Sequence, residues 1–215
     1  MQFYGYFRSS CAYRCRIAFN LKGVEYEFAS VHLRKNGGEH KTPAFLEINP
    51  QGLLPAIVDG PFALNQSLAI VEWLDEKHPS PAFLPDSPEG RAHVRAFSQM
   101  IACDIHPLQN LRVLQYLGNE FGADQSVKDK WCQRWLGDGL AACEAVIARQ
   151  ETKTKYCFGD TPGLADICLV PQVFSAHRFS VDMSEMPNLN RIYESCQELD
   201  AFADAAPGKQ PDAEA

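Results

Sequence analysis

Several features are missing from this sequence, and each absence excludes a class of protein. No apolar stretch approaches the roughly 20 residues that a membrane-spanning helix needs, so we expect no membrane partner. Basic residues form no long block and the net charge is -7, which argues against nucleic acid as a partner. The first residues have neither a basic nor an apolar signal segment, so we expect a cytoplasmic protein.

The eight cysteines also lack the spacing of a redox or metal site. There is no Cys-x-x-Cys pair and no second cluster of Cys and His at zinc spacing. The cysteines lie in apolar, helix-like segments, where free thiols behave as small core residues. We therefore expect reduced thiols and no bound metal.

What the sequence does contain is enough apolar material for a folded protein, with 46% hydrophobic residues in a chain of 215. Over residues 1–80, strand and helix signals alternate in the order βαβ, then ββα with a short helix before it. The predicted strands cover 2–7, 26–32, 54–58 and 62–64, and the predicted helices cover 9–21, a short stretch ending near 50, and 67–77.

A proline-rich stretch then separates two types of pattern. Four prolines fall between residues 79 and 88, which is the composition of a domain boundary. Beyond it, apolar residues recur at helical spacing and no strand signal remains, so we expect an all-helical domain over 89–215 after a first domain over 1–80. The predicted helices cover 91–119, 126–150, 164–177 and 189–205, followed by an extended or loosely ordered tail.

The strongest chemical signal lies where the first strand meets the first helix. Ser9, Ser10 and Cys11 open this helix, and hydroxyl groups at a helix N-terminus stabilise an anion together with the helix dipole. The alternative is structural: a serine here can act only as a helix cap, and Cys11 only as a small packed residue.

Two further features belong to the same domain. Pro55 stands at the head of a predicted inner strand, which suits a cis Leu54–Pro55 bond and leaves the Leu54 backbone as a template for an extended peptide. Gln66 and Ser67 open the next helix, where an amide and a hydroxyl could hold a carboxylate. The alternatives are an edge-strand proline and another helix cap.

These residues belong to a larger set of motifs. The set consists of Arg8-Ser9-Ser10-Cys11 with Arg14 and Arg16-Ile17-Ala18, Asn49-Pro50, Leu54-Pro55, Asn65-Gln66-Ser67-Leu68-Ala69-Ile70, His106-Pro107-Leu108-Gln109-Asn110, the stretch from Leu164 to Gln172, and Arg178-Phe179. It resembles zeta-class glutathione transferases, and within them the group of maleylacetoacetate and maleylpyruvate isomerases. The resemblance implies a thioredoxin-like N-terminal domain that binds glutathione, followed by an all-helical C-terminal domain.

The resemblance also implies roles for single residues. Ser9 would hydrogen-bond the glutathione sulfur, with Ser10 and Cys11 completing the turn. The Leu54 backbone would contact the cysteinyl part of glutathione, and Gln66 and Ser67 would bind the γ-glutamyl carboxylate. Gln109 and Asn110, in a segment that reaches over the cleft, would contact glutathione or the acid substrate.

At the glycine end of glutathione this chain departs from the family. Leu53 stands where the family often has Gln or Lys, and His40 and Gln51 are the nearest polar substitutes.

The resemblance implies a reaction in which glutathione thiolate adds to a cis double bond and is then eliminated, giving the trans product. A diacid substrate in a chain of net negative charge requires local arginines, and we expect Arg8 and Arg178 to bind its carboxylates, with Arg112 as a third candidate. Arg8 also suits a developing negative charge on oxygen.

The leading function that the resemblance implies is isomerisation of maleylacetoacetate to fumarylacetoacetate, and the resemblance also implies a homodimer. The same reaction on maleylpyruvate, glutathione conjugation or dehalogenation of small α-halo acids, and a non-enzymatic scaffold remain as alternatives.

Overall fold

The computed structural model describes residues 1–214 and divides the chain into two compact units. The first unit combines Met1–Phe83 with the segment that starts at Gln197, and the second unit is Leu84–Cys196. The boundary falls inside the proline-rich stretch. The segment from Gln197 onward packs with the first unit, whereas the sequence assigns it to the helical domain over 89–215.

The first unit contains a sheet of four strands in the order β2-β1-β3-β4. β1 pairs in parallel with β2 and antiparallel with β3, and β3 and β4 form an antiparallel hairpin. This is the predicted thioredoxin-like arrangement. The strands are β1 (Gln2–Gly5), β2 (Glu27–Ser30), β3 (Ala56–Asp59) and β4 (Phe62–Asn65).

Helices pack against this sheet through fully buried apolar side chains, among them Phe3, Ile17 and Ile57. α1 ends at Gly23, whose φ of 61° lies in the left-handed region that glycine adopts without strain. The helices of this unit are α1 (Ser10–Lys22), α2 (Pro43–Ile48), α3 (Ser67–Lys77) and α9 (Asp200–Ala203), with short 3-10 turns η1 (Lys35–Gly37), η2 (Glu39–Lys41) and η5 (Pro207–Lys209).

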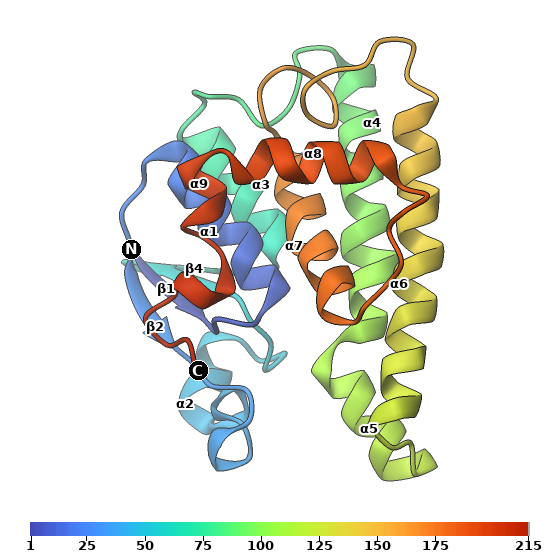
Figure 1. The fold of residues 1–215 in the computed structure, drawn as a ribbon. Coiled ribbons are helices and arrows are strands. Elements are labelled where there is room, and N and C mark those ends of the chain that lie inside the picture. Colours follow the sequence, from blue (N-terminus) through green and yellow to red (C-terminus); the bar gives the residue numbers. More distant parts are fainter. Residues whose placement is uncertain (215) are drawn as a thin grey trace. The chain divides into compact units, whose positions relative to one another are not determined.

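The C-terminal segment is bound to the first unit by specific hydrogen bonds. The sequence predicts an extended or loosely ordered tail after residue 205, whereas the structure has a 3-10 turn at Pro207–Lys209 and a hydrogen-bonded Asp212. α9, drawn in red, lies beside α1 (Figure 1). The Arg16 Nε donates to the Ala205 carbonyl at 2.8 Å, and the backbone N–H of Phe7 donates to the Asp212 carboxylate at 3.1 Å. The segment therefore holds both α1 and the loop that precedes it.

The second unit is all helical in its regular structure, as predicted. Its helices are α4 (Pro88–Gln99), α5 (Leu111–Phe121), α6 (Gln125–Ala148), α7 (Leu164–Arg178) and α8 (Pro187–Gln197), with the irregular turns η3 (Met100–Ile105) and η4 (His106–Gln109).

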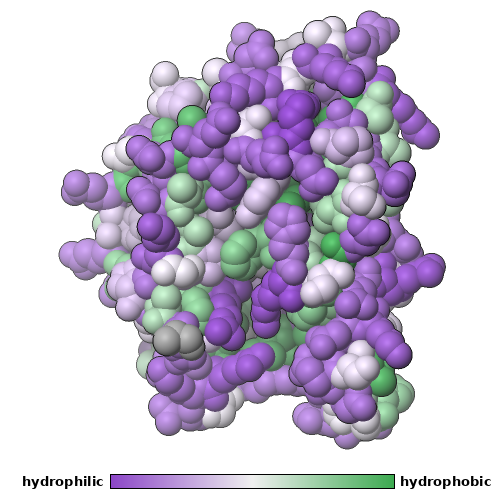
Figure 2. Space-filling model, in the orientation of Figure 1, coloured by the Kyte–Doolittle hydropathy of each residue, from purple (hydrophilic) through white to green (hydrophobic). Residues whose placement is uncertain are grey.

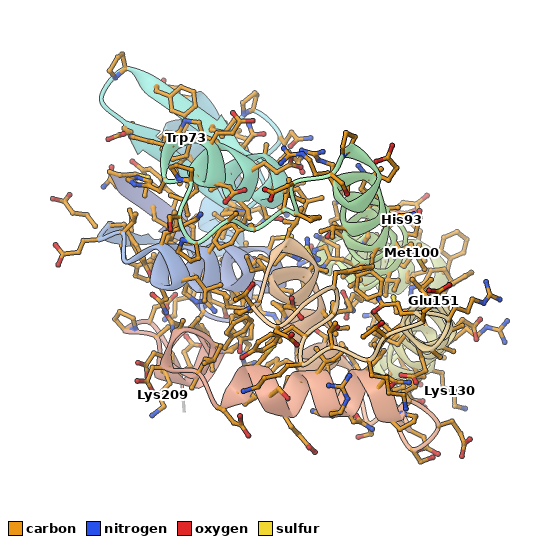
Figure 3. The ribbon with its side chains drawn as sticks, turned by 90° about the horizontal axis from the view of Figure 1, so that it is seen from above. Trp73, His93, Met100, Lys130, Glu151 and Lys209 are labelled. Carbon is orange, nitrogen blue, oxygen red and sulfur yellow. The ribbon has the colours of Figure 1, made fainter. Side chains whose placement is uncertain are left out.

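The single helix predicted over 91–119 is divided in the structure. α4 changes to a π-helical turn at Met100, which is labelled in Figure 3. Pro107 cannot donate a backbone hydrogen bond, and the chain passes through a 3-10 turn before Asn110 caps α5. α6 approaches this region closely, because a Cβ at Gly139 would lie 2.4 Å from the Ile105 side chain.

None of the described helices is both long and apolar enough to cross a bilayer. Hydrophilic side chains predominate on the face shown in Figure 2, and hydrophobic ones appear there in smaller patches. All eight cysteines are free thiols, and seven of them are buried or half-buried.

Candidate anion site at the start of α1 and α3

Ser9 forms the N-terminal cap of α1. Its Oγ accepts a hydrogen bond from the Ala12 backbone N–H at 3.2 Å, and its own N–H donates to the Tyr6 carbonyl at 2.9 Å. The oxygen thus serves as the cap, while the hydroxyl hydrogen can be donated to another acceptor. The capping alternative is real in this structure, and it is compatible with a hydrogen bond from the same hydroxyl to an anion.

Ser10 and Cys11 follow in the first turn of α1, and both are half-buried. The 13-residue helix has no acidic residue in this turn, so nothing there offsets the positive end of its dipole. The structure therefore brings the three predicted residues of the α1 turn together, half-exposed, at an N-terminus that favours an anion.

The start of α3 provides a second set of donors. Ser67 is the first residue of this 11-residue helix and is only 5% exposed. The preceding Gln66 has a φ of 69°, which is strained for a residue with a side chain. Its exposed amide Nε2 donates to the Oε1 of Gln51 at 2.7 Å. Strain of this kind gathers at functional sites, so it supports the assignment of this turn to binding.

Arg14 joins the two helix starts. Its Nη1 donates to the Ser67 Oγ at 3.2 Å and lies 3.8 Å from the Cys11 Sγ, and the side chain is 1% exposed. The sequence places this arginine in the family motif without giving it a role. A charged residue among the apolar positions of α1 is the signal that could have identified it.

Asn49 organises the loop beside this site. Its Nδ2 donates to the Leu53 carbonyl at 2.7 Å, and its Oδ1 accepts from the Gln51 N–H and from Asn65 Nδ2, both at 3.1 Å. The adjacent Leu54–Pro55 bond is cis, as the sequence suggests. One buried amide therefore connects the segment before β3 with the end of β4.

Two other predicted site residues of the first unit, His40 and Arg8, have surroundings that differ from those of Ser9, Arg14 and Ser67. His40 is buried in η2, its Nδ1 makes no hydrogen bond with any described residue, and burial lowers its pKa. Its carbonyl lies 3.1 Å from where a Cβ at Gly52 would stand, so it borders the Gln51 loop. Arg8 is exposed, with its guanidinium 5.0 Å from the Phe7 ring centroid.

The remaining predicted residues lie in the second unit. Asn110 caps α5, since its Oδ1 accepts from the Arg112 N–H at 3.2 Å. The Nε2 of Gln109 is buried without a hydrogen bond to a described residue, whereas Arg112 and Arg178 are exposed. The guanidinium of Arg178 lies 5.1 Å from the Phe179 ring centroid. The roles of these four residues in binding glutathione or the substrate stay predictions.

The donor set of the first unit fits a small ligand with two negative groups. Two helix N-termini, the hydroxyls of Ser9 and Ser67 and a buried guanidinium all favour anions. Glutathione has both kinds of group: a thiol that ionises to a thiolate, and carboxylates at its γ-glutamyl and glycyl ends. A thioredoxin-like unit with this site and a helical second unit defines the class of glutathione transferases.

Comparisons with known proteins agree with this class. The profile of the glutathione S-transferase N-terminal domain matches residues 8–77. A maleylpyruvate isomerase of a Ralstonia species is 49% identical over 212 residues, covering 99% of both chains. The maleylacetoacetate isomerase of Pseudomonas aeruginosa is 45% identical over 213 residues, covering 99% of this chain and 98% of that protein.

A solved structure of high similarity is the maleylacetoacetate isomerase from Methylobacterium extorquens AM1 with bound malonate and GSH. It is 37% identical, has a TM-score of 0.95 and is covered over the full length of both chains. The chain belongs to the zeta-class glutathione S-transferases, in the group of maleylacetoacetate and maleylpyruvate isomerases.

Proposed function

We propose that the protein catalyses the glutathione-dependent cis–trans isomerisation of a maleyl diacid, maleylacetoacetate or maleylpyruvate. The observation that carries the proposal is the pairing of the Ser9 turn with Ser67 through Arg14, which provides donors for a thiolate and a carboxylate in one unit. Full-length similarity to isomerases of both names supports it.

Glutathione, when bound, supplies a thiolate that adds reversibly to the cis double bond and so permits rotation about it. A free thiol has a pKa of about 8.5, so the protein must stabilise the ionised form near neutral pH. The Ser9 hydroxyl and the N-terminus of α1 do so by hydrogen bonding and by the helix dipole, with Ser10 and Cys11 completing the turn.

The rest of the first unit orients the tripeptide. Gln66 and Ser67 bind the γ-glutamyl carboxylate at the start of α3, where Ser67 donates its hydroxyl hydrogen. The Leu54 backbone pairs with the cysteinyl part. Gln51 and His40 border the glycine end, and the hydrogen bond between Gln51 and Gln66 keeps the two ends of the binding site in register.

Arginines bind the diacid. Arg8, next to Ser9, stabilises the negative charge that develops on the substrate carbonyl oxygen. Arg178 binds a substrate carboxylate as a planar fork, with Arg112 as the further candidate, and Gln109 and Asn110 reach the glutathione or the acid.

The amount of glutathione consumed tests this function directly. Purified protein is assayed with maleylacetoacetate and with maleylpyruvate at trace glutathione, following the trans product and the remaining thiol. We expect many turnovers per glutathione, and the faster diacid identifies the substrate.

One glutathione consumed per turnover would instead support conjugation or dehalogenation. Absence of glutathione binding in a calorimetric titration would support the scaffold alternative and reject the proposal.

We also propose a homodimer that acts in the cytoplasm, on the basis of family membership. The exposed Phe62 ring, stacked on Trp73 with centroids 5.3 Å apart, is an apolar surface in the first unit that a second copy could cover. Sedimentation equilibrium of the purified chain is expected to give twice the monomer mass, and a single-chain mass would exclude the dimer.

A further inference from the structure

Arg14 is a buried cation without an anionic partner in the described residues. Its side chain is 1% exposed, and none of the described carboxylates lies within ion-pair distance of it. Its Nε and Nη2 are buried and make no hydrogen bond to a described residue. Burying a charge without a partner costs several kcal/mol or more, by order of magnitude. A buried arginine of this kind destabilises the folded protein, so folding does not explain its presence. We therefore consider a role in ligand binding.

The neighbouring Arg16 shows what a buried structural arginine looks like in the same helix. It is also fully buried, but its Nε and Nη2 donate to the Ala205 and Phe7 carbonyls at 2.8 and 3.1 Å. Burial lowers its pKa to about 10. Arg16 therefore connects backbone segments, whereas Arg14 donates only to side chains of the anion site.

The hydrogen bond from Arg14 fixes the direction in which Ser67 can donate. Because Nη1 occupies a lone pair of the Ser67 Oγ at 3.2 Å, the hydroxyl hydrogen must point elsewhere. The carbonyl of Ser67 is also near the Cys15 thiol, at 4.0 Å, so α1 and α3 are in direct contact here. Ser67 is thereby held as a donor at the N-terminus of α3.

We infer that Arg14 is the positioning residue for the α-carboxylate of the γ-glutamyl group, acting through Ser67 and supplying the buried counter-charge. This inference rests on the proposed function, since it assumes that glutathione is the ligand. Arg14 acts on the carboxylate end of the site more than on the sulfur end. Its contact with the Ser67 Oγ, at 3.2 Å, is shorter than its 3.8 Å contact with the Cys11 Sγ, and sulfur is a weak hydrogen-bond acceptor.

The test compares two ligands on matched variants. Calorimetric titration measures the Kd of glutathione and of its analogue without the α-carboxylate, γ-aminobutyryl-cysteinyl-glycine. In Arg14→Met we expect glutathione to bind about 10- to 100-fold more weakly, the effect of losing a charge-assisted hydrogen bond. The analogue should bind Arg14→Met and the unchanged protein equally within error.

Arg16→Met is the control, because it removes an equally buried arginine that does not contact Ser67. It should weaken both ligands by the same factor. Arg14→Lys restores the charge and should recover part of the glutathione affinity. In steady-state assays, Arg14→Met should raise the KM for glutathione far more than it lowers kcat.

Ser67→Ala keeps the test decisive if Arg14→Met does not fold. It removes the hydroxyl that Arg14 orients and should abolish the preference for glutathione over the analogue. Equal weakening of both ligands by Arg14→Met, or an unchanged preference in Ser67→Ala, would overturn the inference. Failure of the unchanged protein to bind either ligand would instead reject the proposed function.

Discussion

Ser9 has a structural role in the structure and a chemical role in the proposed function. Its oxygen caps α1, and we propose that its hydroxyl hydrogen is donated to the glutathione sulfur. The two tasks can be separated by substitution, because threonine keeps both a cap and a hydroxyl whereas alanine keeps neither.

For Ser9→Ala we expect a loss of stability of about 1 kcal/mol from the cap and a fall in activity near pH 7 of about 10- to 100-fold. The reason is the sign of the pKa change: losing a donor to the thiolate raises the pKa of the bound thiol, so less thiolate exists at neutral pH. The ultraviolet absorbance of the glutathione thiolate against pH measures this shift. Ser9→Thr should behave like the unchanged protein, and an identical pH profile in Ser9→Ala would remove Ser9 from sulfur activation.

The buried cysteines should be unreactive for a physical reason that the structure makes explicit. Burial raises the pKa of the Cys132 thiol to about 11 and that of Cys143 to about 12, so neither forms thiolate at pH 8. In the native protein, iodoacetamide at pH 8 should modify the exposed Cys103 but leave Cys132 and Cys143 unmodified until urea unfolds the chain. Peptide mass spectrometry reads the sites, with Cys103→Ser as control. Rapid native labelling of Cys143 would show that its helix opens.

Among the site residues, those at helix starts could be predicted from the sequence, whereas the role that we propose for Arg14 could not. Hydroxyl and amide residues before an apolar run mark a helix N-terminus, so Ser9 and Ser67 are visible in the chain. A charged residue among the apolar positions of α1 marks Arg14 as unusual, but its proposed role depends on contact between α1 and α3, which no local pattern encodes.

At the scale of elements, Lys22 connects the C-terminal end of α1 with the end of α3 and the segment that follows it. Its side chain is 0% exposed, its Nζ is 2.7 Å from the Asp75 carboxylate, and it also contacts the carbonyls of His78 and Pro81. The ammonium lies 4.1 Å from the Phe83 ring centroid as well. These contacts hold the last residues of the first unit.

Lys22→Met should therefore lower the free energy of unfolding by about 3 kcal/mol, because it leaves a partly buried carboxylate without its partner. The matched control is Lys77→Met, which breaks an exposed ion pair with Asp59 at 2.8 Å and should have little effect. Urea denaturation followed by circular dichroism measures both. A similar loss in the two variants would contradict the importance of the buried contact.

Element types could be predicted well, and element ends less so. α3 spans the predicted range 67–77. Ser67 begins a stretch with apolar residues at helical spacing, and Lys77 ends it. The predicted helix over 91–119 is interrupted because a π-helical turn and Pro107 alter the backbone hydrogen bonding while the apolar spacing continues.

At the scale of the whole molecule, the tail connects residues that are far apart in the chain. The Asp212 Oδ2 accepts from the Phe7 N–H at 3.1 Å and from the Ser30 hydroxyl at 2.9 Å. Farther along, the Glu214 carboxylate is 2.9 Å from Lys35, which lowers the pKa of that carboxyl. Lys209, labelled in Figure 3, belongs to the turn η5 that leads into this tail.

Asp212→Ala should lower stability by about 1 to 3 kcal/mol, because it removes the acceptor of a half-buried backbone N–H. Hydrogen exchange at the Phe7 amide should accelerate, and glutathione affinity should fall because the loop before Ser9 loses a support. Asp204→Ala is the control, since Asp204 is exposed. Unchanged exchange at Phe7 in Asp212→Ala would show that the loop is held without the tail.

The division into two units was predicted near its boundary, because prolines mark linkers locally. The return of the segment from Gln197 to the first unit could not be predicted in this way. The apolar spacing of this segment would be the same whichever unit it packed against. The hydrogen bonds that attach it to the first unit join residues about two hundred positions apart in the sequence.

This return has a consequence for the order of events on the ribosome. An N-terminal domain can usually fold while the remainder is still being synthesised. Here the sheet and α1 emerge early, yet α9 and Asp212 are translated only after the entire helical unit. The nascent first unit therefore remains incompletely packed, with surface accessible to chaperones, until the segment from Gln197 onward has been synthesised.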